Sequence, residues 1–461
     1  MMLRARTFPI PLWLALCAQP TLAALSLPEV AASAVAQSPE VRIKMHQYLG
    51  AEADYRAARA RFFPEVDLGH TSGRTVSDAD AYGNTFRRTA DSRAWSLSMT
   101  QSLFHGFQTL YETRRQDHAK SAQYFQLLDV SQQQALEAAR AFLDVSRHRA
   151  LLVAARQSHD SHQRIYQKIH SKARPQNGVA VAAGVDLEQA AGRLALADAN
   201  MLTAEANLAD VSARYARLVG TAPPGDLARF TPPSPLPARA MTVDATPAVL
   251  ATRAAVSAAR QQVQARRGAF LPRLDARARQ EWGSMPSGGL GVGAPVRVRQ
   301  TVELIGVLNL SRGGADKARL ARAAEELNAA RAQQDKVCRE ARQQWVMAQN
   351  EWEKLQRKIG FLQQHALASE KVRDAYWAQF EISRRTLLDV LDSENEFFRS
   401  RSALIDGEAD LALAGLRTQA ASGTLLDALG IAPALPAPAV AQADAEDAPC
   451  VARDGAVDNH G

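Results

Sequence analysis

The stretch SRAWSLSMTQSLF (residues 92–104) alternates between large apolar and small polar side chains. Successive side chains of a β-strand point to opposite faces, so this stretch predicts a strand with one apolar and one polar face. The apolar positions are Trp95, Leu97, Met99 and Leu103, and the polar positions are Ser96, Ser98, Thr100 and Ser102. Strands of about ten residues with this pattern are typical of a membrane β-barrel. An ordinary sheet with one solvated face is the alternative.

Three further stretches carry strand patterns, so that each half of the chain offers two strands. They are PEVDLGHTSG (64–73), PRLDARARQEW (272–282) and PVRVRQTVELI (295–305). Four strands cannot close a barrel, and an open sheet edge in lipid leaves backbone groups without hydrogen bonds. We therefore expect several chains to contribute to one barrel. Residues 74–91 and 283–294 are expected to form extracellular loops between the strands of each pair.

The chain is a duplicated module. The pattern of residues 38–68, which ends in FFPEVDL, reappears 208 positions later and ends there in FLPRLDA. Residues 184–221 reappear 203 positions later, which pairs Asp186 with Asp389. Internal repetition of this kind indicates that each half is one structural unit.

Outside the repeats, the sequence predicts a signal peptide, a linker and a tail. The complete order is signal peptide (1–23), first repeat (24–230), Pro-rich linker (231–247), second repeat (248–430) and disordered tail (431–461). The signal peptide has a basic start and a short apolar stretch, followed by a small-residue cleavage site. The many prolines of the linker favour an extended course, and the tail contains few large apolar residues.

Both repeats contain unusually long helical patterns. Residues 107–174 include no Gly or Pro, and a rise of 1.5 Å per residue gives a rod of roughly 100 Å. From residue 315 to residue 406 only Gly360 interrupts the pattern. Small and apolar residues recur at heptad spacing, which is typical of a coiled coil with closely approaching helices. These positions are Leu128, Ala135 and Phe142, and, offset by three, Ala138, Val145 and Leu152.

Charge and cysteine content exclude several classes of protein. The net charge is +7, and the arginines are spread among acidic residues without interleaved aromatics, which argues against nucleic-acid binding. No apolar stretch after the signal is long enough for a membrane-spanning helix. The mature chain would keep only Cys338 and Cys450, so we expect no disulfide framework and interpret Cys338 as a thiol buried in the coiled seam. His159 and His162 are interpreted as a solvated helix face, because no further ligands complete a metal site.

These residues resemble the TolC family of outer-membrane export channels over about residues 25–430. The resemblance is carried by the repeated FFPEVDL and FLPRLDA corners, by LSMTQSLFHGFQT and by RRTLLDVLDSENEFF (384–398). The last motif, and LNLSRGGADKARL from residue 308, look most like the branch that serves type I protein secretion. The drug-efflux branch usually has a different sequence after the strand, and it often has a lipidation cysteine that this chain lacks.

The resemblance implies a mainly α protein with a membrane β part. Three chains would form a 12-stranded β-barrel, four strands per chain, on a long coiled-coil tunnel in the periplasm. The implied location is the outer membrane of a Gram-negative bacterium. The implied partners are outer-membrane lipid, an inner-membrane ABC transporter, a periplasmic adaptor (membrane fusion) protein and an exported protein cargo. No nucleic acid, cofactor, metal or catalytic residue is implied.

The family also implies a closed periplasmic aperture. In the family a ring of aspartates lines this aperture, and by position it corresponds to Asp389 and Asp392. The basic residue that ties neighbouring helices together in the closed state, called the latch here, corresponds to Arg385. Asp186 is the residue of the first repeat that matches Asp389. Phe380 belongs to the same latch and stands where the family commonly has a tyrosine. Ser383 stands where the family usually has glycine at the helix turn, a second departure from the pattern.

Three interpretations of Asp389 and Asp392 can be compared from the sequence. A catalytic pair would need a cleft that raises the pKa of one carboxyl, and a helix on a rod supplies none. A solvated helix face is the simple alternative. We favour an acidic ring, because threefold repetition would place six carboxylates around a narrow mouth and select cations.

The most consistent function is an outer-membrane duct for type I protein secretion, exporting a protein such as a toxin or an adhesin. A small-molecule or multidrug efflux duct of the same architecture is the alternative. A periplasmic coiled-coil scaffold is disfavoured, because a soluble scaffold would not present alternating strands with an apolar outer face.

Overall fold

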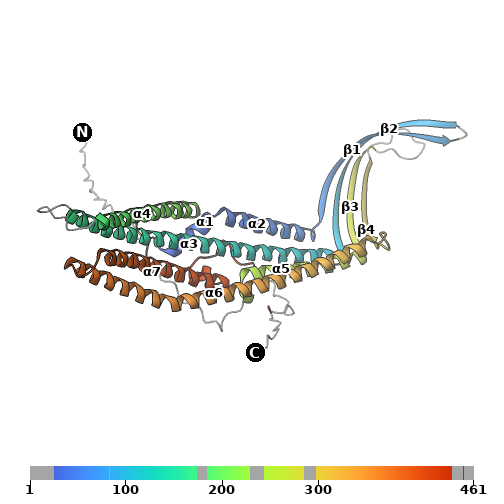
Figure 1. Ribbon diagram of the computed structural model, residues 1–461. Helices are drawn as coiled ribbons and strands as arrows, with labels where there is room; N and C mark the ends of the chain where they lie inside the picture. The colour runs from blue at the N-terminus through green and yellow to red at the C-terminus, as the bar shows by residue number, and fades with distance from the viewer. Residues whose placement is uncertain are drawn as a thin grey trace, which may run out of the picture.

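A four-stranded sheet and a rod of long helices lie end to end in an elongated molecule (Figure 1). The computed structural model describes residues 25–81, 84–173, 184–228, 243–284, 297–438 and 450. The predicted signal peptide and residues 231–242 of the predicted linker lie outside these residues. The domain boundaries therefore stay predictions.

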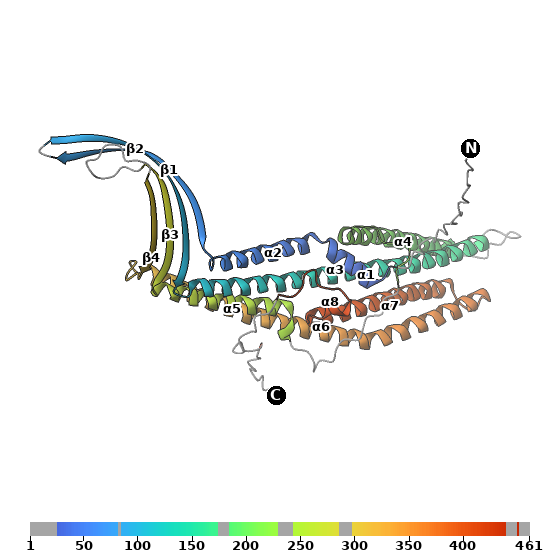
Figure 2. The same cartoon turned by 180° about the vertical axis from the view of Figure 1, so that it is seen from behind.

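Two helices run almost the full length of the rod, α3 (Gln108–Ala173) and α6 (Ala315–Glu381). Shorter helices lie beside each of them, end to end: α2 (Pro39–Ala60) and α4 (Gly184–Val219) along α3, and α5 (Pro247–Arg267) and α7 (Leu387–Ala421) along α6 (Figure 2). Both α5 and α7 also pack against α3, which joins the two halves. The 66 residues of α3 span roughly 100 Å, as the absence of Gly and Pro predicts.

The middle of the rod contains the main core. There α1 (Leu27–Gln37) and α8 (Leu425–Ala428) pack against α3, alongside the C-terminal ends of α4 and α7. The heptad prediction is confirmed for the positions that are almost fully buried, namely Ala135, Ala138, Phe142 and Val145. Leu127, not its neighbour Leu128, occupies the preceding buried position. Small side chains in this seam allow α3 and its neighbours to approach closely.

The sheet has the order β1-β2-β3-β4, and every neighbouring pair is antiparallel. Its strands are β1 (Glu65–Ala81), β2 (Asn84–His105), β3 (Arg273–Ser284) and β4 (Arg297–Val307). The predicted loop at residues 74–91 is wrong, because β1 and β2 continue as a paired hairpin almost to its tip. Cross-strand ion pairs, Arg74–Asp91 at 2.7 Å and Asp78–Arg87 at 3.1 Å, lie where no apolar alternation indicates a strand. The predicted loop at 283–294 falls mostly outside the described residues.

One face of the sheet exposes a row of large apolar side chains. Trp95 and Trp282 are direct partners across β2 and β3, and the row also contains Leu97, Met99, Leu103, Val298, Val302 and Leu304. The alternation predicted from the sequence is thus confirmed. Such a face is what lipid would cover on the outside of a barrel.

Within the described ranges, no helix is both long and apolar enough to cross a membrane.

Ile431 and Cys450, two described residues of the predicted tail, contact the rod, which differs from the expectation of a wholly disordered tail. Ile431 is buried in the main core, and Cys450 forms a disulfide with Cys338 of α6. The amide of Cys450 donates to Asp244 at 2.7 Å, and Arg342 donates to the Cys450 carbonyl at 2.6 Å. The prediction of a free Cys338 thiol is therefore wrong, and the two cysteines form a single disulfide rather than a framework of several. The local sequence around Cys450 carries no pattern that could reveal its place beside α6.

Candidate functional site

The tip is the end of the rod far from the sheet, where a short turn joins α6 to α7. The helical pattern breaks at residues 382–386, whereas Gly360 lies inside α6 without interrupting it. Ser383 has a φ of +60°, a left-handed conformation that glycine adopts most readily. The turn is closed by backbone bonds from Ser383 to Phe380 (3.0 Å) and from Arg384 to Gln379 (2.8 Å). The conformation for which the family usually has glycine is thus adopted here by serine.

Asp389 belongs to a capping box at the start of α7. Its amide donates to Thr386 Oγ1 at 3.2 Å, and its carboxylate accepts from the Thr386 hydroxyl at 2.8 Å and from the Thr386 amide at 3.3 Å. These hydrogen bonds from Thr386, with a smaller contribution from Arg385, lower the pKa of Asp389. A carboxylate in this position stabilises the first turn of a helix. Asp389 therefore has a structural role within a single chain.

Asp392 lies one turn further along α7 and connects the two halves of the chain. Its carboxylate forms an ion pair with Arg193 of α4 at 2.8 Å. More than half of the Asp392 side chain stays exposed, at 58%, so solvent screens this pair strongly. The side chain of Asp186, at the first turn of α4, has no hydrogen bond or ion pair within the described part of the chain.

Arg385 is held against the end of α6 by three contacts. Its Nε donates to Gln379 Oε1 at 2.9 Å, and its guanidinium lies 4.3 Å from the centre of the Tyr376 ring. Its Nη1 is 3.8 Å from the Asp389 carboxylate. These contacts place the side chain across the α6–α7 turn, where it stiffens the turn.

Phe380 is buried, at 7% exposure, in an apolar cluster in which four helices meet near the tip. The tip cluster consists of Phe380 (α6), Ile165 and Ile169 (α3), Ala190 (α4), and Leu387, Val390 and Leu391 (α7). Lys172 lies 5.3 Å from the centre of the Phe380 ring. The cluster joins both coiled pairs at the tip. Apart from Phe380, sequence reasoning missed these residues, although the spacing of four residues between Ile165 and Ile169 places both on one face of α3.

The two histidines of α3 differ from the predicted solvated face. His159 Nε2 lies 3.1 Å from Asp198 of α4, and His162 is buried, at 2% exposure, beside Asn395 of α7. Burial, together with the positive charge of Arg193, lowers the pKa of His162, and the neighbouring Asn395 side chain opposes that shift. Among the described residues, no group of His, Cys, Asp and Glu could hold a metal ion.

A polar cleft with a volume of about 590 Å³ lies next to the tip cluster, between α3, α6 and α7. Glu394 is buried there, and burial raises the pKa of its carboxyl, opposed by Arg373 and Arg164. The Arg373 guanidinium stacks 3.9 Å from the centre of the Phe397 ring. No sequence motif marked these residues, because they come from three separate helices.

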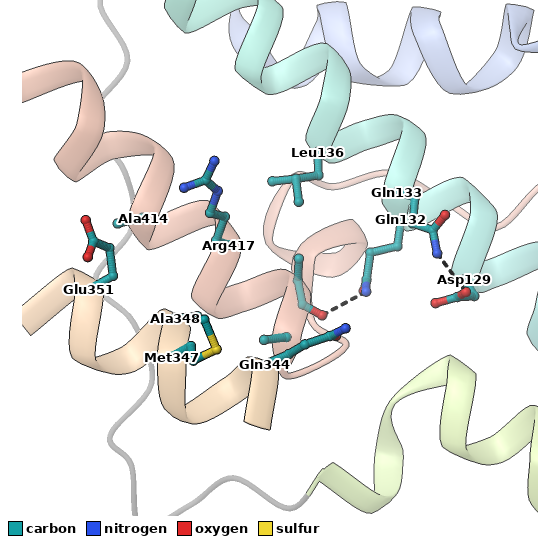
Figure 3. Close-up of a pocket in the computed structure, with 12 residues that line it drawn as sticks. Asp129, Gln132, Gln133, Leu136, Gln344, Met347, Ala348, Glu351, Ala414 and Arg417 are labelled. Atoms are coloured by element: carbon teal, nitrogen blue, oxygen red, sulfur yellow. Dashed lines mark hydrogen bonds between the residues drawn. The ribbon is translucent and has the colours of Figure 1, made fainter. Parts of the chain in front are cut away.

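A second cavity, of about 470 Å³, lies between α3, α6 and the C-terminal end of α7 (Figure 3). Gln132 of α3 reaches across to donate to the carbonyl of Ala420 at 2.8 Å, and Gln133 donates to Asp129 at 2.9 Å. Burial raises the pKa of Asp129, and Lys44 opposes that shift. Met347 and Arg417 face this cavity from α6 and α7.

Comparison with known proteins identifies relatives of this architecture. Residues 30–221 and 242–424 match the family described as outer membrane efflux protein. The outer membrane efflux protein BepC of Brucella suis biovar 1 (strain 1330) is 26% identical over 388 residues, which cover 81% of this chain and 80% of BepC.

Solved structures share the fold at lower identity. The CmeC outer membrane channel of Campylobacter jejuni superposes with a TM-score of 0.73 at 13% identity, covering 87% of this chain and 86% of CmeC. The outer membrane protein VceC of Vibrio cholerae superposes with a TM-score of 0.71 at 18% identity, covering 88% of this chain and 96% of VceC.

Proposed function

The chain belongs to the outer membrane efflux protein family, and on that premise we propose that it is the outer-membrane duct of a type I secretion system. It is a channel protein and not an enzyme, and it lies in the outer membrane with its helical tunnel in the periplasm. Its cargo would be an exported protein, such as a toxin or an adhesin. An inner-membrane ABC transporter and a periplasmic adaptor would deliver that cargo to the tip.

One observation carries the channel function: a sheet with an apolar face stands directly on a rod of paired helices (Figure 2). The four strands form an open sheet. In lipid, the backbone groups along an open sheet edge would have no hydrogen-bond partners. A homotrimer resolves this conflict, because β4 of one chain can pair with β1 of the next until the barrel closes.

Protein cargo is supported by the motifs at both ends of α6. The segment from residue 308 enters α6 from the sheet, and residues 384–398 form the turn into α7. Both resemble the type I secretion branch. A small-molecule efflux duct is the second candidate, favoured by the similarity to BepC, whose name describes it as an efflux protein.

The cargo is tested by deleting the gene in its host and restoring it on a plasmid. Type I secretion predicts that a protein disappears from the medium after deletion and returns with the plasmid. An unchanged set of secreted proteins, with increased sensitivity to small toxic compounds, would contradict this proposal and favour efflux.

At the tip, we propose that Asp389 and Asp392 form an acidic ring in the trimer. In this proposal Arg385, Asp186 and Phe380 help to keep the tip closed. The contacts within one chain are compatible with the ring, because both carboxylates remain more than one-third exposed, at 37% and 58%. Exposed carboxylates around a narrow mouth would attract cations.

Planar-bilayer recording tests the ring with Asp389→Asn and Asp392→Asn combined. We expect a larger conductance and a weaker preference for cations, because six negative charges leave the trimer. Thr386→Ala is the matched control, since it removes the cap of α7 and keeps both carboxylates. If Thr386→Ala changes selectivity as much as the double variant does, helix capping explains the effect and the ring is wrong.

A further inference from the structure

A basic cavity with a volume of about 190 Å³ lies at the base, which is the junction between the sheet and the helices. Four arginines from three elements line it: Arg266 at the end of α5, Arg273 at the start of β3, and Arg312 and Arg319 beside the start of α6. Gln108, the first residue of α3, closes another side. The chain thus brings together four guanidinium groups that are far apart in the sequence.

The carboxylates at the base do not balance these arginines. Asp316 is buried, at 9% exposure, and its carboxylate lies 3.1 Å from Arg319 and 3.5 Å from Arg312. Arg273 pairs with Asp275 at 2.9 Å. Arg266 has no ion-pair partner within the described part of the chain. Two carboxylates therefore face four guanidinium groups, and the cavity carries a positive charge.

The arginines also keep their donors available. The side chains of Arg273, Arg312 and Arg319 are about half exposed, at 48%, 53% and 58%, although each has a carboxylate partner. Each guanidinium has five N–H donors, and a single carboxylate cannot occupy all of them. The start of α6 adds the positive end of a 67-residue helix to the same region.

Strand geometry shows towards which side the cavity opens. Arg273 lies on the opposite face of β3 from Trp282, because their positions differ by an odd number. Val307, the partner of Arg273 on β4, also lines the cavity. In a barrel the apolar face contacts lipid and the polar face lines the interior. The cavity therefore opens towards the lumen, so a lipid headgroup does not explain it.

We infer that this cavity is an anion-binding site on the lumen wall, which takes carboxylate or phosphate groups of molecules that pass from the tunnel into the barrel. This inference rests on the proposed channel function. Arginine binds both groups through paired hydrogen bonds. Pockets for whole drug-sized ligands have volumes of about 300–1,000 Å³, so a cavity of 190 Å³ accepts a single anionic group and not an entire molecule. In a trimer, three such sites would surround the lumen at one level.

Block of single-channel current by inorganic pyrophosphate tests the site. Pyrophosphate is added on the side of the strand tips, from which the base is reached without crossing the closed tip. We expect voltage-dependent block of the wild type. Arg266→Gln combined with Arg312→Gln should require at least about tenfold more pyrophosphate for half block, because two of the four guanidinium groups that line the cavity lose their charge and their paired donors.

Arg277→Gln is the matched control. Arg277 lies on the same strand and face as Arg273 but pairs with Glu303 at 3.4 Å, outside the cavity. This variant should be blocked like the wild type. Equal loss of block in Arg277→Gln would mean that the general charge of the lumen attracts pyrophosphate, and it would overturn the inference.

The remaining outcomes separate this inference from the channel function. A conducting wild-type channel that pyrophosphate does not block would overturn the anion site and leave the duct intact. If folded protein forms no channel, the duct itself is wrong, and calorimetric titration of detergent-solubilised protein then decides whether the arginines bind pyrophosphate.

Two sources of the anionic group can be distinguished with a second probe. A short polyglutamate peptide that blocks with the same dependence on Arg266 and Arg312 indicates that the site accepts acidic segments of a polypeptide. Block by pyrophosphate alone indicates a site for small anions. Block by neither probe contradicts an anion site of either kind.

Discussion

The tip and the base lie at opposite ends of the same helices, but their charged side chains are used differently. At the tip, Asp389 caps α7, Asp392 pairs with Arg193, and Arg385 is held by Gln379. At the base, Arg266 has no ion-pair partner among the described residues. Charges at the tip hold helices of one chain together around an apolar cluster. The positive charges at the base exceed the carboxylates that pair with them among the described residues, and we infer that this excess binds an anionic group.

The largest effect among the variants that test this difference between the tip and the base is expected from Phe380→Ala. Removal of a buried phenylalanine typically costs about 3–5 kcal/mol, and this ring packs where four helices meet. We expect a clear increase in the resting conductance, because the tip, which we propose to be closed, loses its apolar core. Pyrophosphate block at the base should be unchanged.

Phe380→Leu is the control for this change, since it keeps most of the apolar volume. It should behave almost like the wild type in bilayer recordings. An unaltered resting conductance in Phe380→Ala would contradict the role of the tip cluster in closure.

An intermediate effect is expected from pH, through His162. The folded protein lowers the pKa of His162, so the unfolded chain binds the proton more readily than the folded one. The stabilising contribution is complete above the unfolded pKa of about 6.5 and is lost as the pH falls below it. The melting temperature of the wild type should therefore decrease between pH 7.5 and pH 5.5.

His162→Gln should weaken this pH dependence, because glutamine is neutral at both pH values. The readout is the difference in melting temperature between the two pH values, compared for wild type and variant. An identical difference in both proteins would exclude His162 as its origin.

The smallest effect is expected from the ion pair between Arg193 and Asp392. Exposed pairs contribute about 0.2–1 kcal/mol, so Arg193→Asp alone should lower the melting temperature only slightly. Combining it with Asp392→Arg restores opposite charges and should recover most of the loss.

The exchanged pair also tests the proposed acidic ring at the tip. If Asp392 belongs to an acidic ring, the exchange changes ion selectivity even though stability returns. Wild-type selectivity in the exchanged protein would assign Asp392 to helix pairing alone.

The elements that could be predicted are those with a regular local pattern. The alternation at residues 92–104 indicates the apolar sheet face, and the absence of Gly and Pro indicates the length of α3. The length of the β1–β2 hairpin could not be predicted, because beyond residue 73 it is stabilised by backbone pairing and cross-strand ion pairs. Neither leaves an apolar alternation in the sequence.

The candidate tip residues were indicated by resemblance, and their contacts by the structure alone. Motif position marks Asp389, but only the folded turn shows its bond with Thr386. Likewise, a histidine pair on a helix suggests a solvated face until α7 packs over His162.

By itself, the sequence determined the duplication, the long helices and the two-faced strands, because local spacing controls which side chains share a face. The tertiary structure alone decided the Cys338–Cys450 disulfide, the tip cluster and the basic cavity at the base. Each of these depends on residues that are distant in sequence, and their meeting is set by the packing of whole helices and strands.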